Sequence, residues 1–152
     1  MGLTILIMCL LSFAVRAADD PQTGTWNLNL AKSKYSHGFP TPRSQTHTYE
    51  QAGLDGMTFT QDGLDEQGKP VHVEYTANYD GKAYPVYGDP NRDTVALKRV
   101  GTYETKGTSK KAGKVVGTFT RVVSKDGRVL TITLKGTRNG RQYNNVIVYD
   151  KQ

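Results

Sequence analysis

The feature that most constrains this chain is a two-residue alternation of apolar and polar side chains, which recurs in nearly every segment after residue 17. In 70–79, for example, Val71, Val73, Tyr75, Ala77 and Tyr79 alternate with polar residues. This is the pattern of a β-strand that buries one face. Residues 18–152 show no apolar stripe of helical spacing over ten or more residues, and the best candidate for a helical turn is the short segment 29–35. The alternation therefore predicts an all-β fold.

Asp-Gly and Asn-Gly pairs divide these alternating segments at regular intervals. Such pairs tolerate the positive φ that tight hairpins require, so they predict antiparallel neighbours. We expect turns at Asp55-Gly56, Asp62-Gly63, Asp80-Gly81, Asp126-Gly127 and Asn139-Gly140. The segments between turn signals predict about ten strands, at 23–30, 44–51, 56–61, 70–79, 82–87, 93–99, 102–108, 113–124, 128–136 and 142–150.

Sequential strands with one apolar face and no covering helices predict an antiparallel up-and-down β-barrel of about 8–10 strands, because closure removes exposed strand edges. Two longer connections interrupt the pattern. Residues 33–44 contain Pro40 and Pro42, so we expect them to cross one end of the barrel. Residues 84–93 place Tyr84 and Tyr87 on either side of Pro85, in a corner that either redirects the chain or forms a rim for a ligand.

The first 17 residues differ from the rest of the chain. Residues 2–15 are uncharged and mostly apolar, which predicts a secretory signal peptide at 1–17 and one barrel domain at 18–152. The apolar run is short for a membrane helix, which needs about 20 residues, and an amino-terminal anchor is the alternative. The single cysteine, Cys9, lies in this segment, so the mature domain holds no disulfide. We expect a secreted or periplasmic protein with no membrane span after signal removal.

Charge is divided unevenly along the chain. The segment 98–141 carries twelve Lys or Arg residues against two acids, whereas 17–97 carries six bases against eleven acids. The basic second half either meets an anionic surface or is the solvated face of ordinary strands. Because these bases alternate with Thr and Gly and do not cluster with aromatic residues, the sequence predicts no specific nucleic-acid partner.

The opening of the first predicted strand, Gly24-Thr25-Trp26, resembles the Gly-x-Trp opening of lipocalins and other calycin barrels. The wider runs "YDGKAYPVYGDPNRDTVALKR" and "GKVVGTFTRVVSKDGRVLTIT" are similar to small exported bacterial proteins of lipocalin-like type, a family without an established activity. The calycin resemblance implies a calyx for a small apolar molecule, with Gly24 and Trp26 at its closed end. The same opening also resembles biotin-binding barrels of the avidin type, but those line their pocket with several Trp residues and this chain has only Trp26.

Aromatic and basic residues are the candidates for a ligand pocket. Fatty-acid-binding barrels, which also have ten strands, hold a carboxylate with an Arg-x-Tyr pair on the last strand, and Arg141-Gln142-Tyr143 is similar to that pair. In 113–124 one face carries Phe119 and Arg121, and the other carries Val116 and Val122, so the register is open. If the first face points inward, Arg121 is a buried cation that requires a partner or a ligand. The full set of candidate ligand-binding residues is Tyr75, Tyr84, Tyr87, Phe119, Arg121, Arg141 and Tyr143.

Motifs for catalysis are missing from the sequence. His37, His47 and His72 are scattered without metal-site spacing, and neither a Gly-x-Ser-x-Gly elbow nor a phosphate loop is present. We therefore expect no metal, no cofactor and no enzymatic activity. The leading hypothesis is an exported, non-catalytic protein that binds a small apolar or amphipathic molecule. The alternative is an envelope-associated interaction protein whose barrel is filled by its own side chains and whose basic surface meets an anionic partner.

Overall fold

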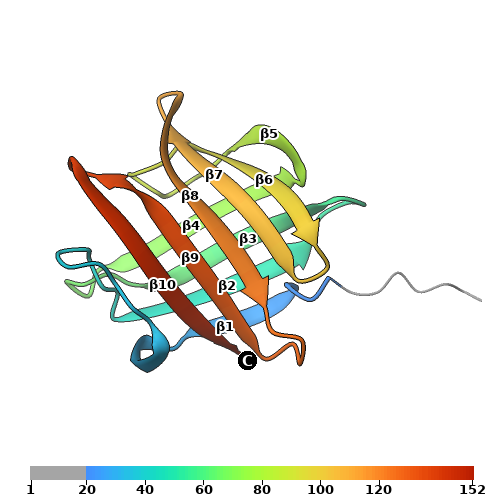
Figure 1. The fold of residues 1–152 in the computed structure, drawn as a ribbon, viewed down its shortest axis with the longest axis horizontal. Helices are drawn as coiled ribbons and strands as arrows, with labels where there is room; N and C mark the ends of the chain where they lie inside the picture. Colours follow the sequence, from blue (N-terminus) through green and yellow to red (C-terminus); the bar gives the residue numbers. More distant parts are fainter. Residues whose placement is uncertain (1–19) are drawn as a thin grey trace, which may run out of the picture.

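A computed structural model describes residues 20–152, which form one ten-stranded antiparallel sheet (Figure 1). The predicted signal peptide lies outside the described residues. The strand and helix bounds are β1 (Gly24–Leu28), η1, a 3-10 helix (Leu30–Lys32), β2 (Ser44–Gln51), β3 (Gly56–Leu64), β4 (Pro70–Asn78), β5 (Asp80–Pro85), β6 (Thr94–Gly101), β7 (Glu104–Lys111), β8 (Lys114–Val123), β9 (Val129–Arg138) and β10 (Arg141–Lys151). The ten strands expected from the alternation are thus confirmed, and η1 falls within the segment predicted to hold a helical turn.

The sheet closes into a nearly complete barrel. Its strand order is β4-β3-β2-β1-β10-β9-β8-β7-β6-β5, so the first and last strands pair and join the two halves. Figure 1 shows β1 to β4 crossing behind β6 to β10. The edge of β4 is joined to the segment that follows β5 by an isolated bridge between Glu74 and Tyr87, with backbone hydrogen bonds of 2.9 and 3.1 Å. The predicted antiparallel calycin-like barrel is therefore confirmed, with its seam between β4 and β5.

The predicted turns at Asp126-Gly127 and Asn139-Gly140 lie between strands, whereas the predicted turn at Asp80-Gly81 is wrong, because both residues belong to β5. Asn139 and Gly140 both have positive φ, at 51° and 74°, as their two-residue turn between β9 and β10 requires. The predicted turn at Asp62-Gly63 is wrong, because β3 continues through it to Leu64. Gly63 pairs with Gln45, and a Cβ at position 63 would overlap the backbone of β2, so this glycine permits close strand approach.

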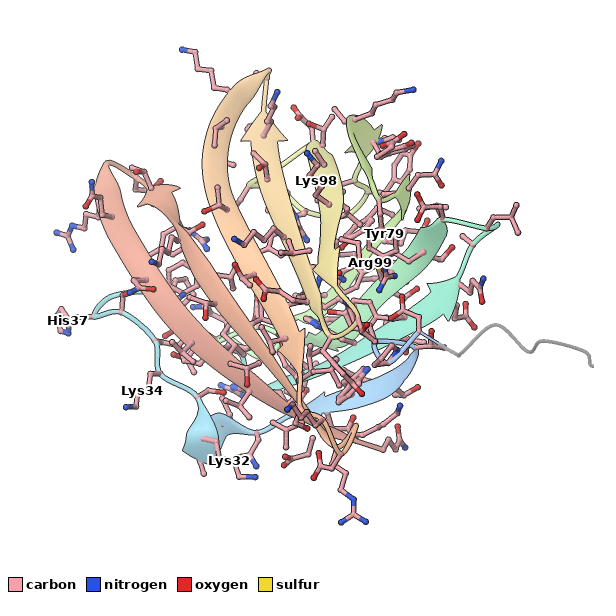
Figure 2. The ribbon with its side chains drawn as sticks, turned by 45° about the vertical axis from the view of Figure 1, so that its right-hand side comes forward. Lys32, Lys34, His37, Tyr79, Lys98 and Arg99 are labelled. Atoms are coloured by element: carbon pink, nitrogen blue, oxygen red, sulfur yellow. The ribbon has the colours of Figure 1, made fainter. Side chains whose placement is uncertain are left out.

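The two ends of the barrel are closed differently. The lid, defined as residues 33–43, runs from β10 to the β3–β4 turn. At one side Lys34 exchanges backbone hydrogen bonds of 2.7 and 2.8 Å with Val146, and at the other the Arg43 Nε donates to the Glu66 carbonyl at 3.1 Å. We call this end the mouth and the opposite end the base. Figure 2 shows Lys34 and His37 at the mouth and Tyr79 and Arg99 toward the base.

The segment that precedes β1 closes the base. Trp26 is fully buried there, and its indole N–H donates to the Gln22 carbonyl at 2.9 Å. Asp20 accepts a hydrogen bond from Tyr79 at 3.2 Å and forms an ion pair with Arg99. Burial alone would raise the pKa of Asp20, but the hydrogen bonds from Arg99 and the Gln22 backbone hold that pKa below its ordinary value. The base is therefore sealed by an aromatic ring and a partly buried ion pair.

No helix in the described part of the chain has the length and hydropathy of a membrane span.

Candidate functional site

The register of β8 places Arg121 inside the barrel. Phe119, Arg121 and Val123 are buried, whereas Val122 on the other face is exposed. This settles the register that the sequence left open. The choice follows from packing across the strands: Phe119 pairs with Gly107 on β7, and a Cβ at 107 would overlap the phenyl ring. The glycine provides the space for the ring and thereby fixes the inward face of β8.

Arg121 is the candidate site's central residue. Its side chain is 1% exposed and reaches across the barrel, where Nη1 lies 3.4 Å from the Met57 sulfur. The guanidinium carbon lies 5.0 Å from the centre of the Tyr49 ring and 5.1 Å from that of Phe119. Within 20–152 no acidic side chain forms an ion pair with Arg121, and neither its Nε nor its Nη2 has a hydrogen-bond partner. A buried charge without a counter-ion is costly, which makes this guanidinium a candidate anion site.

The guanidinium keeps its charge in this environment. Burial alone would lower the pKa of Arg121, but the surrounding phenol groups of Tyr75, Tyr49 and Tyr79 offset it, and the pKa lies above its ordinary value. The faces of aromatic rings also attract cations electrostatically, more strongly when water is excluded. The interior therefore presents a permanent positive charge with two unused N–H groups.

A hydrogen-bonded chain of neutral polar side chains follows the inner face of β2. Tyr149 donates to the Gln45 side-chain oxygen, and its own oxygen lies 3.2 Å from His47 Nε2. The same Nε2 lies 3.2 Å from the Gln61 side-chain oxygen, and Nδ1 lies 3.1 Å from the Tyr49 hydroxyl. Since Gln61 offers an acceptor, His47 carries its proton on Nε2, and the Tyr49 hydroxyl donates to Nδ1. The chain thus connects Gln45, near the mouth, to the ring that covers Arg121.

His47 is neutral in this network. Complete burial lowers the pKa of its imidazole to about 3; the hydrogen bond with Gln61 opposes this shift, and the positive charges of Arg121 and Arg92 add to it. A second buried cation beside Arg121 is thereby excluded at neutral pH. The interior combines one fixed positive charge with a neutral hydrogen-bonding wall.

Aromatic rings form the remaining wall. The His47 ring stacks on Tyr149 with centroids 4.3 Å apart, and Phe59 lies 4.9 Å from His47 and 4.8 Å from Tyr75. Arg92, from the loop between β5 and β6, lies 5.8 Å from the Tyr75 ring and is paired with Asp89 at 2.9 Å. These flat surfaces suit an apolar or aromatic body attached to an anionic group.

Two hollows lie at the mouth. The first, of about 660 Å³, is lined by the mouth ends of β8, β9 and β10 and by Ser36 of the lid. The second, of about 400 Å³, lies between the lid and the β9–β10 hairpin. Tyr143 lines both, and its ring lies 4.8 Å from Phe39, which in turn lies 5.6 Å from the Arg138 guanidinium carbon. The contact between Phe39 of the lid and Tyr143 of β10 therefore lies beside both hollows.

The structure brings only part of the predicted residue set together. Tyr75, Phe119 and Arg121 point into the interior. Tyr143 lies at the mouth. Outside this group, Tyr84 is half-buried and donates to Asp80, Tyr87 is 59% exposed beside the seam, and Arg141 is exposed at the hairpin. Gly24 and Trp26 lie at the base, where Gly24 has a φ of 126° and leaves space for the Lys151 side chain.

Sequence reasoning missed most of the polar interior. The missed residues are Gln45, His47, Tyr49 and Met57. On β2 the inward residues Gln45, His47 and Tyr49 alternate with smaller or charged outward ones, and this size alternation was the available signal. Residues 20–152 contain no group of three His, Cys, Asp or Glu side chains placed to hold a metal ion.

Comparisons with known proteins bear on the fold. No protein-family model matches this sequence, and no curated protein matches it. Among solved structures, wild-type fluorescent protein UnaG is similar, with a TM-score of 0.59 at 17% identity over 86% of this chain and 96% of UnaG. A UnaG mutant gives the same TM-score at 16% identity over 87% and 96% of the two chains. A redesigned β-barrel, mFAP1, bound to DFHBI, matches at 9% identity and a TM-score of 0.48, over 86% of this chain and 95% of that one. At 16% and 17% identity the likeness to the two UnaG structures shows the fold alone, a calycin-type barrel.

Proposed function

We propose that this protein is an exported, non-catalytic binding protein for a small amphipathic carboxylate, held in the barrel with its anionic group on Arg121. The single observation that carries this proposal is the buried guanidinium with free Nε and Nη2 atoms. These two N–H groups form one edge of the planar fork, which matches the two oxygens of a carboxylate. The aromatic rings around the fork would contact the apolar body of the ligand.

The charge around the mouth supports an anionic ligand. Arg138 and Arg141 of the β9–β10 hairpin and Lys135 of β9 line its hollows, and no acidic side chain does so. A mouth of one sign raises the local concentration of oppositely charged ligands and their rate of entry. Lid movement at Phe39 and Tyr143 would admit the ligand to the interior. The fold shared with UnaG is compatible with this arrangement.

Calorimetric titration with decanoate tests the site. Replacing Arg121 with Met keeps the length of the side chain and removes the fork, and we expect decanoate to bind about tenfold to hundredfold more weakly, the range for a lost charged hydrogen bond. The matched control is Arg128→Met, which removes an exposed charge from the β8–β9 connection at the base and should change the affinity by about twofold or less. Equal affinities of the wild type and Arg121→Met would contradict the proposal.

Two further measurements address export and ligand identity. The mass of the mature protein recovered outside the cytoplasm should correspond to a chain beginning at Ala18. Native mass spectrometry of protein purified from its own envelope, followed by lipid extraction, should release a small carboxylate. Recovery of the full-length chain in the cytoplasm would contradict export, and persistent absence of any small molecule would contradict the binding function.

A second candidate function rests on the outer face of β6 to β9. Lys98, Lys106 and Thr120 lie in one cross-strand row, and exposed Lys135 lies on the same face. The alternative is therefore an interaction protein with a self-filled barrel that meets an anionic surface through these lysines. Retention on anionic vesicles that disappears in high salt, together with no decanoate binding, would favour this alternative.

A further inference from the structure

Asn145 presents an unused donor to the interior beneath the lid. It is fully buried on the inward face of β10, and its Oδ1 accepts from the Ser36 backbone N–H at 2.8 Å. A backbone N–H only donates, so this bond fixes which end of the amide faces the lid. The Nδ2 group therefore points away from Ser36, and it has no hydrogen-bond partner among the described residues. A buried amide N–H₂ without an acceptor is costly, which marks this position as a polar subsite.

Tyr35 places a second unpartnered group in the same region. Its hydroxyl oxygen is buried and has no hydrogen-bond partner within 20–152, although the ring packs against the core and stacks on Phe39 with centroids 6.3 Å apart. Burial raises the pKa of Tyr35 to about 12, so the hydroxyl keeps its proton and can donate. Tyr35 and Ser36 are consecutive in the lid, so the Tyr35 side chain leaves the backbone beside the residue that orients Asn145.

The subsite is distinct from the guanidinium. Arg121 pairs with Ile132, which pairs with Ile147, and Asn145 lies two residues from Ile147 toward the mouth. Two strand spacings and two residues of rise separate the Cα atoms of Arg121 and Asn145 by about 12 Å. The Arg121 side chain contacts Tyr49 on β2 and Met57 on β3. The barrel therefore holds an anion site toward the base and a neutral donor pair near the mouth.

We infer that the ligand carries a second polar group, a neutral carbonyl that accepts hydrogen bonds from Asn145 Nδ2 and the Tyr35 hydroxyl while its carboxylate binds Arg121. This inference rests on the proposed function and narrows its ligand to oxo-carboxylates. A carbonyl fits because both free groups donate, and a second anion does not, because neither group carries a charge. The apolar residues between the two subsites, Phe119, Leu134 and Ile147, would contact the chain that joins the ligand's polar groups.

Two probes of equal length test the inference. Decanoate and 9-oxodecanoate differ by one carbonyl, and calorimetry on the whole protein should show 9-oxodecanoate binding about threefold to tenfold more tightly, as expected for one or two neutral hydrogen bonds. Asn145→Asp keeps the oxygen that accepts from Ser36 and replaces the donor with an acceptor, so the preference should disappear. Tyr35→Phe keeps the stacked ring and should reduce the preference for 9-oxodecanoate. Asn144→Asp, on the outward face, is the matched control and should retain the preference.

The side-chain amide signals of Asn145 in NMR spectra provide a readout that does not depend on a variant. They should shift when 9-oxodecanoate is added and stay close to their free positions with decanoate. Equal affinities for the two probes, or a preference that persists in Asn145→Asp, would overturn the second subsite. The proposed function would still stand in that case if decanoate binding depended on Arg121. Failure of both probes to bind would overturn both.

Discussion

The buried imidazole of His47 predicts that this protein loses stability in mild acid. The pKa of His47 is about 3 in the folded state, against the ordinary value of 6.5 that the unfolded chain restores. Between these two pKa values the imidazole is protonated in the unfolded state and neutral in the folded state, so the free energy of unfolding falls as the pH falls. Each pH unit below 6.5 lowers the free energy of unfolding by about 1.4 kcal/mol through this one group. Between pH 7.5 and pH 5.0, which lies 1.5 units below 6.5, the loss is about 2 kcal/mol.

Urea unfolding at pH 7.5 and 5.0, at constant ionic strength, measures this loss. The variant His47→Gln removes the titrating group and should show little pH dependence in this window. The carboxyl of Asp20 does not add to the pH dependence between pH 7.5 and 5.0. Its low pKa in the folded state stabilises the protein above the ordinary pKa of 3.8, and that stabilisation is lost only as the pH falls further.

His72 is the matched control for this experiment. It is exposed, and hydrogen bonding to Asp62 raises its pKa above the ordinary value, so its protonation favours the folded state in acid. His72→Gln should therefore keep the acid loss caused by His47, or enlarge it. If wild type and His47→Gln lose the same free energy between pH 7.5 and 5.0, the neutral buried imidazole is not the cause, and the assignment of the network fails.

Three other substitutions test the energetics of the interior. Arg121→Met should raise the free energy of unfolding of the ligand-free protein by about 1–3 kcal/mol in urea titrations, because it removes an uncompensated buried charge; a loss of stability would contradict this. Tyr149→Phe should cost about 1–3 kcal/mol, since Gln45 loses its donor and remains half-buried, and an unchanged urea midpoint would argue against the network. Trp26→Ala should cost about 3–5 kcal/mol by opening a cavity at the base, and thermal unfolding that matches wild type would show that the indole does not seal it.

The fold was accessible from the sequence because its two signals are local. Apolar alternation marks each strand, and glycines with positive φ, such as Gly127 at 72°, mark the hairpins. The error at Asp62-Gly63 shows the limit of such a signal. The turn forms three residues later, where the Asp65 carboxylate accepts from the backbone N–H groups of Gln67 and Lys69 at 2.9 and 2.8 Å. Pairing with β2 across Gly63 outweighs the local preference of the dipeptide.

The candidate site was less accessible because it depends on contacts between distant strands. Both faces of β8 carry apolar residues, and the inward one is selected by Gly107 on a neighbouring strand. The segment "SQTHTYEQ" of β2 alternates in side-chain size but has no apolar face. The pattern therefore indicates a face of larger side chains, at Gln45, His47 and Tyr49, without showing that this face is buried. Inside the barrel His47 contacts Gln61 on the adjacent β3 and Tyr149 on β10, two strands away, and no local sequence pattern records these contacts.

The polar interior is best explained as a single electrostatic arrangement. Arg121 supplies a permanent charge whose field lowers the pKa of His47, and the neutral His47 in turn accepts from Tyr49, whose ring faces the guanidinium. A carboxylate on Arg121 would cancel part of that field at His47. Linkage then requires that ligand binding raise the pKa of His47 and that protonation of His47 favour the bound state over the free state. An uncompensated guanidinium destabilises an empty barrel, so the same charge that weakens the free protein provides the free energy with which it would hold an anion.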